Sequence, residues 1–379
     1  MRDPNDRRSW SGTLYSMARS LERNCGEVLG VGPLLPPELK VGNVIRRGIR
    51  VVSRKEYLYT HTDFLARKLG KMAEQRLAKN RCDVIVAAVA AGIVPYLRTN
   101  LPIVYISDTT FRLMIGYNSE FSNTFARQVR TADKLEHTSI RKSSRFVYPS
   151  RWAADSAIRD YGAAEEATHV IPFGANLEPG PSREQALRKR GGDHCKLLFV
   201  GVNWEQKGGP VAFETLLELE RLGIKSSLTV VGCKPPASFH HPRLRIVSFL
   251  DKNEPAEREQ LQGLYEESSF LILPTRAECF GIVFCEASAY GLPSLAPNTG
   301  GVSGAIRDGV NGFLLPCNAR GSEYAKEIQR AFTDKTAYQR IRTSSRDEYE
   351  QRLNWDAWGQ RMHEIIETAL AGSKMVQVA

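Results

Sequence analysis

The sequence lacks the features that mark membrane-spanning, secreted and zinc-binding proteins. Its apolar runs are far shorter than the roughly 20 residues that a transmembrane helix needs. The first residues, MRDPNDRRSWSG, contain no hydrophobic core like that of a signal peptide. Its seven cysteines form no C-x-x-C pair, which is typical of reduced thiols in the cytoplasm. We therefore expect a cytoplasmic protein without a zinc site.

The sequence also has no D-x-D motif, no short-period repeat and no low-complexity segment. Nothing visible requires a divalent cation bridging a phosphate, so we expect no metal and no bound cofactor. The 379 residues are 42% hydrophobic and 25% charged, which is ordinary for a globular protein. This length predicts two domains, each large enough for its own core.

The excess of positive charge lies in one half of the chain. Residues 1–172 contain 27 Lys and Arg but 17 Asp and Glu, whereas residues 173–379 contain 25 of each. The net charge of +10 thus belongs to the first half. This excess favours an acidic acceptor or anionic lipid at the inner face of a membrane; a solvated basic surface is the alternative. Nucleic acid is not expected, because no recognition motif accompanies the charge.

Strand-like runs alternate with amphipathic stretches, which predicts an α/β protein with parallel sheets and helices on both faces. In the first half the predicted strands are 27–31, 83–89, 103–107, 145–148 and 168–171, and the clearest helices are 13–24, 64–79, 121–140 and 150–161. In the second half the predicted strands are 196–200, 226–231, 244–249, 270–273, 294–296 and 313–315, and the predicted helices are 210–222, 255–267, 282–290, 320–333, 335–352 and 355–371. The order predicts two doubly wound, Rossmann-like domains.

The predicted domains are residues 1–172 and 195–352, joined by a linker over 173–194 that is rich in Pro, Gly and charge. The helix at 355–371 is expected to pack back on the first domain. Trp10-Ser11-Gly12-Thr13 is typical of the loop after the first strand of a doubly wound domain. Since nine residues precede that loop, we expect the first strand to be missing from this chain; a sheet that is one strand short is the alternative.

Two glutamates, Glu278 and Glu286, flank a predicted turn from a buried strand to a helix. Gly281 lets the backbone turn closely, and the first helical amides, near Ile282 and Val283, make an anion site with the helix dipole. Carboxylates repel phosphate but accept hydrogen bonds from hydroxyl groups. The pattern predicts a ligand with a central diphosphate and polyols at both ends, a nucleotide-sugar. Glutamates on a solvated helix surface are the alternative.

A second loop, residues 201–209, follows the strand predicted at 196–200 and contains Lys207 beside two glycines. Ligands of open α/β sheets bind outside the carboxyl ends of the strands, where both loops are expected to lie. We therefore predict that Lys207 meets the diphosphate. A surface lysine without a ligand is the alternative.

The stretch LPTRAECFGIVFCEASAYGLPSLAPNTGGVSGAIRDGVNGFLL resembles the donor-site signature of the family 4, group 1 type glycosyltransferases. RSWSGT, YISD and IPFGAN are similar to a bacterial branch of that family. The resemblance implies a retaining hexosyltransferase with the GT-B fold, in which two domains face each other across a cleft. It implies transfer from a nucleotide-sugar to a hydroxyl acceptor, in polysaccharide or glycoconjugate biosynthesis.

The resemblance also implies roles for single residues. Glu278 would contact hydroxyls of the transferred sugar, and Glu286 the ribose of the nucleotide. Lys207 and the amides after Gly281 would neutralise the diphosphate, which Gly12 would approach from the other domain. The other implied donor-site residues are Gly201, Gly300 and Gly301.

The sequence departs from the family pattern at three positions. Relatives commonly carry an arginine where this chain has Val202 or Gln206. A charge-assisted contact contributes roughly 1.5–3 kcal/mol, so we expect weak donor binding unless Arg276 substitutes. Asp108 stands where many relatives have a histidine and is our catalytic candidate on the acceptor side. Two alternatives remain open: a nucleotide-sugar-binding protein with little or no activity, and a nucleotide-sugar epimerase.

Overall fold

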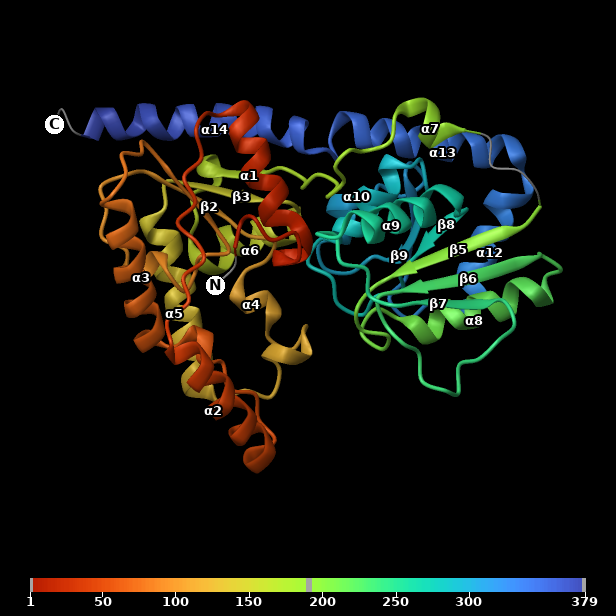
Figure 1. Ribbon diagram of the computed structural model, residues 1–379, viewed down its shortest axis with the longest axis horizontal. Helices are drawn as coiled ribbons and strands as arrows, with labels where there is room; N and C mark the ends of the chain where they lie inside the picture. Colours follow the sequence, from red (N-terminus) through yellow and green to blue (C-terminus); the bar gives the residue numbers. More distant parts are fainter. Residues whose placement is uncertain (1–2, 189–192, 377–379) are drawn as a thin grey trace. The chain divides into compact units, whose positions relative to one another are not determined.

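Two parallel sheets organise the computed structural model, which describes residues 3–188 and 193–376 (Figure 1). Each sheet belongs to its own unit of the chain. The first unit contains residues 3–5, Met17–Ile171 and residues 359–376, and the second contains Asp6–Ser16 and Pro172–Trp358. Residues 6–16 thus group with the second unit, whereas the sequence analysis assigned them to the first domain.

The first unit is built on a four-stranded parallel sheet in the order β1-β2-β3-β4. Its strands are β1 (Ile85–Ala88), β2 (Ile103–Ile106), β3 (Arg145–Tyr148) and β4 (Thr168–Val170). The helices in this part of the chain are α1 (Thr13–Asn24), α2 (Glu38–Ser53), α3 (Asp63–Leu77), α4 (Phe111–Met114), α5 (Ala126–Lys142) and α6 (Arg151–Tyr161). Short 3-10 turns are η1 (Ser9–Gly12), η2 (Tyr59–His61), η3 (Val94–Tyr96), η4 (Ser119–Phe121) and η5 (Glu165–Ala167).

Helix α3 shows how the first core is assembled. Thr62 caps the helix by accepting a hydrogen bond from the amide of Leu65, which is a preferred helix start. Leu65, Leu69 and Ala73 recur at intervals of four residues and are fully buried, as expected for one face of an amphipathic helix. That face packs in the same apolar core as Tyr105 of β2.

The second unit is built on a six-stranded parallel sheet in the order β10-β9-β8-β5-β6-β7. Its strands are β5 (Cys195–Val200), β6 (Ser226–Val231), β7 (Leu244–Val247), β8 (Phe270–Ile272), β9 (Ser294–Pro297) and β10 (Gly312–Leu315). Its helices are α7 (Arg183–Leu187), α8 (Gly209–Arg221), α9 (Pro255–Glu267), α10 (Ile282–Ala289), α11 (Val302–Ala305), α12 (Gly321–Thr333) and α13 (Lys335–Gln351), and α14 (Trp355–Val376) follows.

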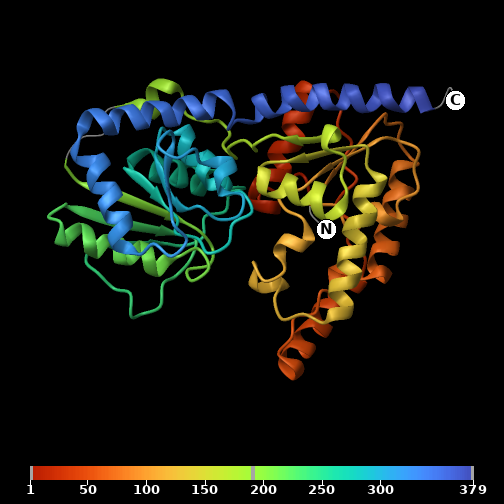
Figure 2. The ribbon, with the colours of Figure 1, turned by 180° about the vertical axis from the view of Figure 1, so that it is seen from behind.

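The strand order of the second sheet changes direction between β5 and β8. From β5 the chain adds β6 and β7 on one side, and from β8 it adds β9 and β10 on the other. Helix α8 packs with α12, and α10 packs with α13, so that helices cover both faces of the sheet (Figures 1 and 2). This is a doubly wound sheet, and ligands bind at the point where its strand order reverses.

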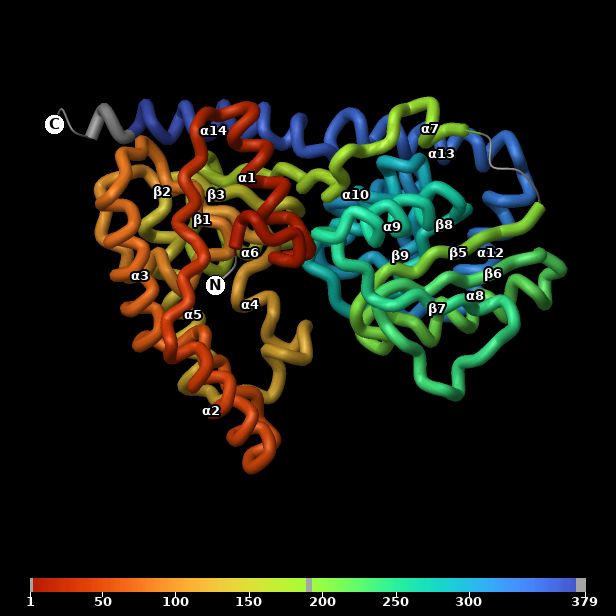
Figure 3. The backbone as a smooth tube through the Cα atoms, viewed as in Figure 1, coloured from red at the N-terminus to blue at the C-terminus, as the bar shows by residue number. Residues whose placement is uncertain are grey.

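The two parallel sheets confirm the predicted fold class, but two local predictions need correction and one helix was missed. The strand predicted at 27–31 is wrong, because these residues pair with no strand. Gly30 and Gly32 weaken an extended segment and Pro33 removes a backbone donor. Helix α2 was not predicted, and α5 begins at Ala126 rather than at 121. Figure 3 shows the chain between α1 and α2 as an open stretch along the first unit.

The length and hydropathy of the helices bear on membrane insertion. In the part of the chain that the structure describes, no helix combines the length and apolarity needed to cross a bilayer.

Candidate functional site

The two loops at the switch point of the second sheet bring Lys207 and Glu278 together. Lys207 lies in the loop after β5, and Glu278 in the loop after β8. The Nζ atom of Lys207 lies 2.5 Å from Oε2 of Glu278. The side chains are 22% and 14% exposed, so solvent and a ligand can still reach them. The predicted neighbours thus form an ion pair at the edge where ligands bind.

Backbone contacts hold these loops against each other. The amide of Arg276 donates to the carbonyl oxygen of Gln206 at 2.9 Å, and the hydroxyl of Thr275 donates to the same oxygen at 3.3 Å. Gly208 has a φ of +78°, and a Cβ there would lie 1.8 Å from the carbonyl oxygen of Pro274. Glycine is therefore required for the close approach of the loops.

Helix α10 points its first turn at the same place. Gly281, with a φ of +88°, precedes the helix, and the amide of Phe284 bonds back to the carbonyl of Gly281. Ile282 and Val283 are half-buried, whereas the helix is fully buried from Phe284 onward. The first amides of a helix have no acceptor within it. A Cβ at Gly281 would lie 3.3 Å from Cγ of Glu278, so the free amides of Ile282 and Val283, with the helix dipole, are the candidate anion site next to Glu278.

Glu286 lies one turn into α10 and is 2% exposed. It forms an ion pair with Lys252, and the hydroxyl of Tyr265 donates to its other oxygen at 2.9 Å. Burial raises the pKa of Tyr265 well above its ordinary value, so this phenol stays a donor. A ribose hydroxyl would therefore have to share the carboxylate with Lys252 or displace it.

Lys252 and Tyr265 are site residues that the sequence analysis missed. Lys252 follows β7 at the same edge of the sheet, and its carbonyl accepts a hydrogen bond of 2.9 Å from Arg258. Its neighbour Asn253 donates to Asp6 at 3.0 Å, which ties this loop to the start of the second unit. The available signal was the position of Lys252 just after a predicted strand; its pairing with Glu286 depends on the fold.

The loop that contains Gly12 packs inside the second unit. Trp10, Ser11 and Gly12 all have positive φ, and the side chain of Asn176 donates to the carbonyl oxygen of Ser11 at 2.9 Å. The ring of Phe173 lies 5.4 Å from the ring of Trp10. This loop was expected to reach the donor site from the other domain, but it groups with the unit that carries Glu278.

The signature stretch contributes structural contacts as well as candidate ligands. The ring of Phe280 lies 5.4 Å from that of Phe173, which links the ECFG turn to the aromatic cluster at Trp10. The amide of Gly301 donates to the carbonyl of Glu278 at 3.1 Å, so the loop containing Gly300 and Gly301 supports the Glu278 backbone.

Asn311 and Gly201 lie next to α10 and Lys207, respectively. Asn311 is fully buried and bonds to Ser288 of α10 and to the carbonyl oxygen of Ala305, so its role is to hold the turn before β10. Gly201 lies beside the stem of Lys207, because a Cβ there would lie 3.0 Å from Cγ of Lys207.

The remaining predicted residues are placed as follows. Asp108 is half-buried and follows β2, in the first unit rather than in the unit of Glu278. Val202 is 68% exposed, and Arg276 is also exposed, beside the backbone of Gln206. Solvent therefore reaches both Val202 and Arg276.

The structure also shows the state of the cysteines and which side chains are grouped closely enough to bind a metal ion. All seven cysteines are free thiols. Burial raises the pKa of Cys285, which suits a packing residue of α10. Within residues 3–188 and 193–376, no group of three or more His, Cys, Asp or Glu side chains could hold a metal ion.

Comparisons with known families match both parts of the chain. The model described as "Glycosyltransferase Family 4" matches residues 12–179, and the model described as "Glycosyl transferases group 1" matches residues 194–334. Together these two ranges contain most of the chain and every residue discussed in this site except Asp6, Trp10 and Ser11.

Similar curated proteins are named D-inositol 3-phosphate glycosyltransferase. The protein from Streptomyces bingchenggensis is 27% identical over 259 residues, which is 64% of this chain and 56% of that protein. The protein from Nocardiopsis dassonvillei is 29% identical over 265 residues, which is 64% of this chain and 60% of that protein. The chain thus matches somewhat more than half the length of these relatives.

Solved structures with the same fold include sucrose-phosphate synthase from Thermosynechococcus elongatus. Its TM-score is 0.64 at 19% identity, covering 91% of this chain and 83% of that one. HepE from Anabaena, solved with UDP-glucose, has a TM-score of 0.56 at 19% identity and covers 80% of this chain and 82% of its own. At these identities the likeness establishes the fold.

Proposed function

The chain belongs to the group 1 glycosyltransferases of family 4 and has their GT-B fold, and from this premise we propose that it is a retaining hexosyltransferase. It moves a sugar from a nucleotide-sugar donor to a hydroxyl acceptor. The observation that carries the proposal is the meeting of Lys207, Glu278 and the first turn of α10 at the switch point of the second sheet. This arrangement offers cations and amides to a diphosphate, and a carboxylate to a polyol.

The proposed roles follow from the charge of each group. Lys207 and the amides of Ile282 and Val283 neutralise the diphosphate, whose charge grows as the bond to the sugar breaks. Glu278 accepts hydrogen bonds from hydroxyls of the transferred sugar, while Glu286 accepts them from the ribose. The remaining proposed donor-site residues are Gly12, Gly201, Gly281, Gly300 and Gly301.

The pairing of Lys207 with Glu278 suggests how the donor is recognised. The ammonium of Lys207 lies against the carboxylate of Glu278. A diphosphate at the start of α10 would attract the same ammonium and leave Glu278 with accepting capacity for sugar hydroxyls. Diphosphate and sugar are then recognised together, because each takes one half of the ion pair.

The proposed reaction is a front-face displacement without a metal. The bond between the anomeric carbon and the diphosphate oxygen breaks, the acceptor oxygen bonds to the same face, and the leaving phosphate takes the acceptor's proton. Asp108 is the proposed side chain that orients the acceptor. Lys207 and the helix amides supply the positive charge that a bridging cation would otherwise provide.

The partners and compartment of the enzyme form part of the proposal. The free thiols favour the cytoplasm. The net charge of the first half favours an acceptor or a surface that is anionic.

Binding and transfer are tested in one series. Titration calorimetry with UDP and UDP-glucose, the ligands named for the HepE structures, measures donor binding. Transfer to added acceptors is then assayed with EDTA and with magnesium. Donor binding with transfer in EDTA supports the proposal, whereas transfer that requires magnesium contradicts the metal-free mechanism.

A second candidate function has one observation in its favour. Val202 and Gln206 leave the loop of Lys207 without the arginine common in relatives, which favours a protein that binds a nucleotide-sugar but transfers little. Nucleotide binding without transfer or donor hydrolysis would identify the chain as such a binding protein. Conversion of the donor sugar without any acceptor would instead identify an epimerase.

A further inference from the structure

Helix α2 presents an apolar surface that the rest of the first unit does not cover. Val41, Val44, Ile45 and Val52 are 57%, 70%, 42% and 87% exposed. Their spacing of three, four and eleven residues places them on one face of a helix. The neighbouring Val51 is 82% exposed. An exposed stripe of this kind marks a surface that meets an apolar partner.

The opposite side of α2 is attached to the first unit. A Cβ at Gly42 would lie 1.9 Å from the ring of Tyr59, so glycine permits close packing there. Leu39 packs against the main core, and Glu38 forms an ion pair with Lys68 of α3. Figure 1 shows α2 extending past the ends of α3 and α5. The helix is thus fixed on one side and open on the other.

The charges around the apolar stripe are all of one sign. Residues 39–55 contain six Lys and Arg and no Asp or Glu. The acidic residues on either side of this range are paired, Glu38 with Lys68 and Glu56 with Arg46 and Arg50. Exposed cations, including Lys40 and Arg47, border the apolar stripe.

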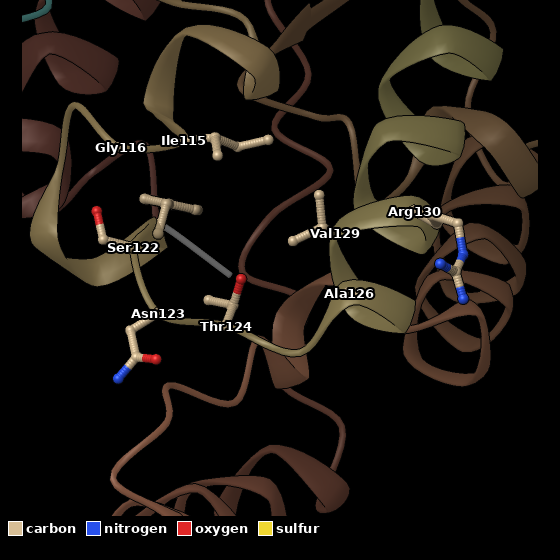
Figure 4. Close-up of a pocket in the computed structure, with 9 residues that line it drawn as sticks. Ile115, Gly116, Ser122, Asn123, Thr124, Ala126, Val129 and Arg130 are labelled. Carbon is tan, nitrogen blue, oxygen red and sulfur yellow. The ribbon is translucent and has the colours of Figure 1, made fainter.

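An apolar hollow lies beside the end of α2. It has a volume of about 530 Å³, and its lining includes Ile115 and Val129, which point toward each other across it, while Arg130 points outward (Figure 4). Asn123, also in the lining, donates to the carbonyl oxygen of Arg54 at 2.8 Å. This hydrogen bond ties the wall of the hollow to the residue that follows α2.

We propose that α2 docks the enzyme on an anionic lipid bilayer, with its valine stripe among the upper acyl chains and its cations at the headgroups. An apolar stripe bordered by Lys and Arg is the pattern of helices that lie in the plane of a membrane interface. Each Lys or Arg near an anionic surface adds to the attraction, which falls off within a Debye length. A protein partner would need acidic groups around an apolar groove, and a bilayer with anionic lipid supplies both features without a specific fit.

Vesicle co-flotation of the full chain tests the docking. Vesicles of phosphatidylcholine with about 30 mol% phosphatidylglycerol are compared with pure phosphatidylcholine, at about 0.1 M and about 0.5 M salt. The chain should float with the anionic vesicles, several-fold less at high salt, and little with the neutral ones. Hydrogen exchange in 39–52 should slow when anionic vesicles are present.

Two double variants separate the apolar from the electrostatic contribution. Val44→Glu with Val52→Glu should lower the partition coefficient at least about tenfold, whereas Leu222→Glu with Ile246→Glu, at exposed positions of the second unit, should not. Lys40→Glu with Arg47→Glu should lower it at least about tenfold, in contrast to Lys134→Glu with Arg141→Glu on the exposed side of α5.

Three outcomes would overturn the proposal. One is a wild-type chain that stays unbound with anionic vesicles, and another is an α2 variant that floats like the wild type. The third is a chain that self-associates through α2, in a concentration-dependent way that Val44→Glu abolishes, and binds no vesicles. Donor binding by calorimetry is independent of α2, so loss of docking leaves the proposed transferase activity untouched.

Discussion

Two buried glutamates, one in each unit, differ in the side chains that contact them. Glu286 on α10 and Glu136 on α5 are 2% and 5% exposed, and each accepts a hydrogen bond from a tyrosine, Tyr265 at 2.9 Å and Tyr105 at 3.2 Å. Glu286 also pairs with Lys252. Among the described residues, no cation forms an ion pair with Glu136.

The difference shows what burial does with and without a counter-ion. Burial raises the pKa of Glu136 to about 7, because the charged form loses its hydration and the hydrogen bond from Tyr105 offsets only part of that loss. The Glu136 carboxyl is therefore uncharged at pH values below about 7, and it acts as a packing group. Lys252 gives Glu286 an opposite charge in contact, which makes the pair a polar element of the candidate donor site. Similar burial thus leaves one glutamate with a tyrosine alone and the other with a tyrosine and a counter-ion.

The largest expected effect concerns Glu278, the partly exposed glutamate of the site. Glu278→Gln keeps the shape but removes the charge that accepts sugar hydroxyls, and we expect turnover to fall about 10²–10³-fold. Thermal stability should stay unchanged, because Glu278 is partly exposed. Glu205→Gln, an exposed change in the opposite loop, is the control. Near-wild-type turnover of Glu278→Gln would remove this residue from the mechanism.

Glu136→Gln should alter how stability depends on pH. The unfolded carboxyl, with an ordinary pKa of 4.5, loses its proton first as the pH rises, and the folded one loses it near 7. The folded state therefore binds more protons between these values, and the stability of the first unit falls across this window by up to about 3 kcal/mol.

Glutamine cannot titrate, so the variant should lack this fall and should be the more stable protein at pH 8. Urea titrations at several pH values, read by hydrogen exchange in α5, measure the difference. Parallel pH profiles for the variant and the wild type would show that Glu136 does not titrate in this range.

Lys207→Ala should weaken binding of a nucleoside diphosphate. The lost charge-assisted contact contributes roughly 1.5–3 kcal/mol, which is on the order of ten- to a hundredfold in the dissociation constant. Calorimetry with UDP measures the change, and Lys225→Ala, an exposed lysine of the same unit, should bind like the wild type. Unchanged UDP affinity of Lys207→Ala would place the diphosphate elsewhere.

The smallest expected effect is that of Glu286→Gln, which concerns one of the two buried glutamates. It leaves Lys252 without its counter-ion in a mostly buried position, and we expect a loss of about 1–2 kcal/mol in the stability of the second unit. Thermal unfolding measures this loss, with Glu278→Gln as the matched variant that should not show it. Equal melting temperatures for the two variants would mean that the buried pair contributes no net stability.

Local patterns predicted the elements that bury one face. The strand at 226–231 and the helices at 13–24 and 255–267 have the predicted limits, because their apolar residues recur with the period of their own structure. Helix α2 escaped prediction because its valines face outward and Gly42 and Gly48 lower its helix propensity. The stretch 27–31 alternates like a strand but finds no neighbour to pair with.

The candidate site likewise has a part that the sequence predicted and a part that it did not. The loops of Lys207 and Glu278 could be predicted, since each follows a strand, and the carboxyl ends of parallel strands share one edge of a sheet. The partners of Glu286 could not, because Lys252 and Tyr265 come from two other elements, and no local spacing connects them with α10.

The order of residues along the chain is enough to specify helices, strands, tight glycine turns and the sheet edge at which chemistry happens, since these depend on neighbours a few positions apart. Which ammonium meets which carboxylate, and whether a valine stripe faces core or solvent, depends on segments that are far apart in the chain. These pairings arise from packing: the ion pair between Lys252 and Glu286 exists because β7 and α10 belong to one folded unit.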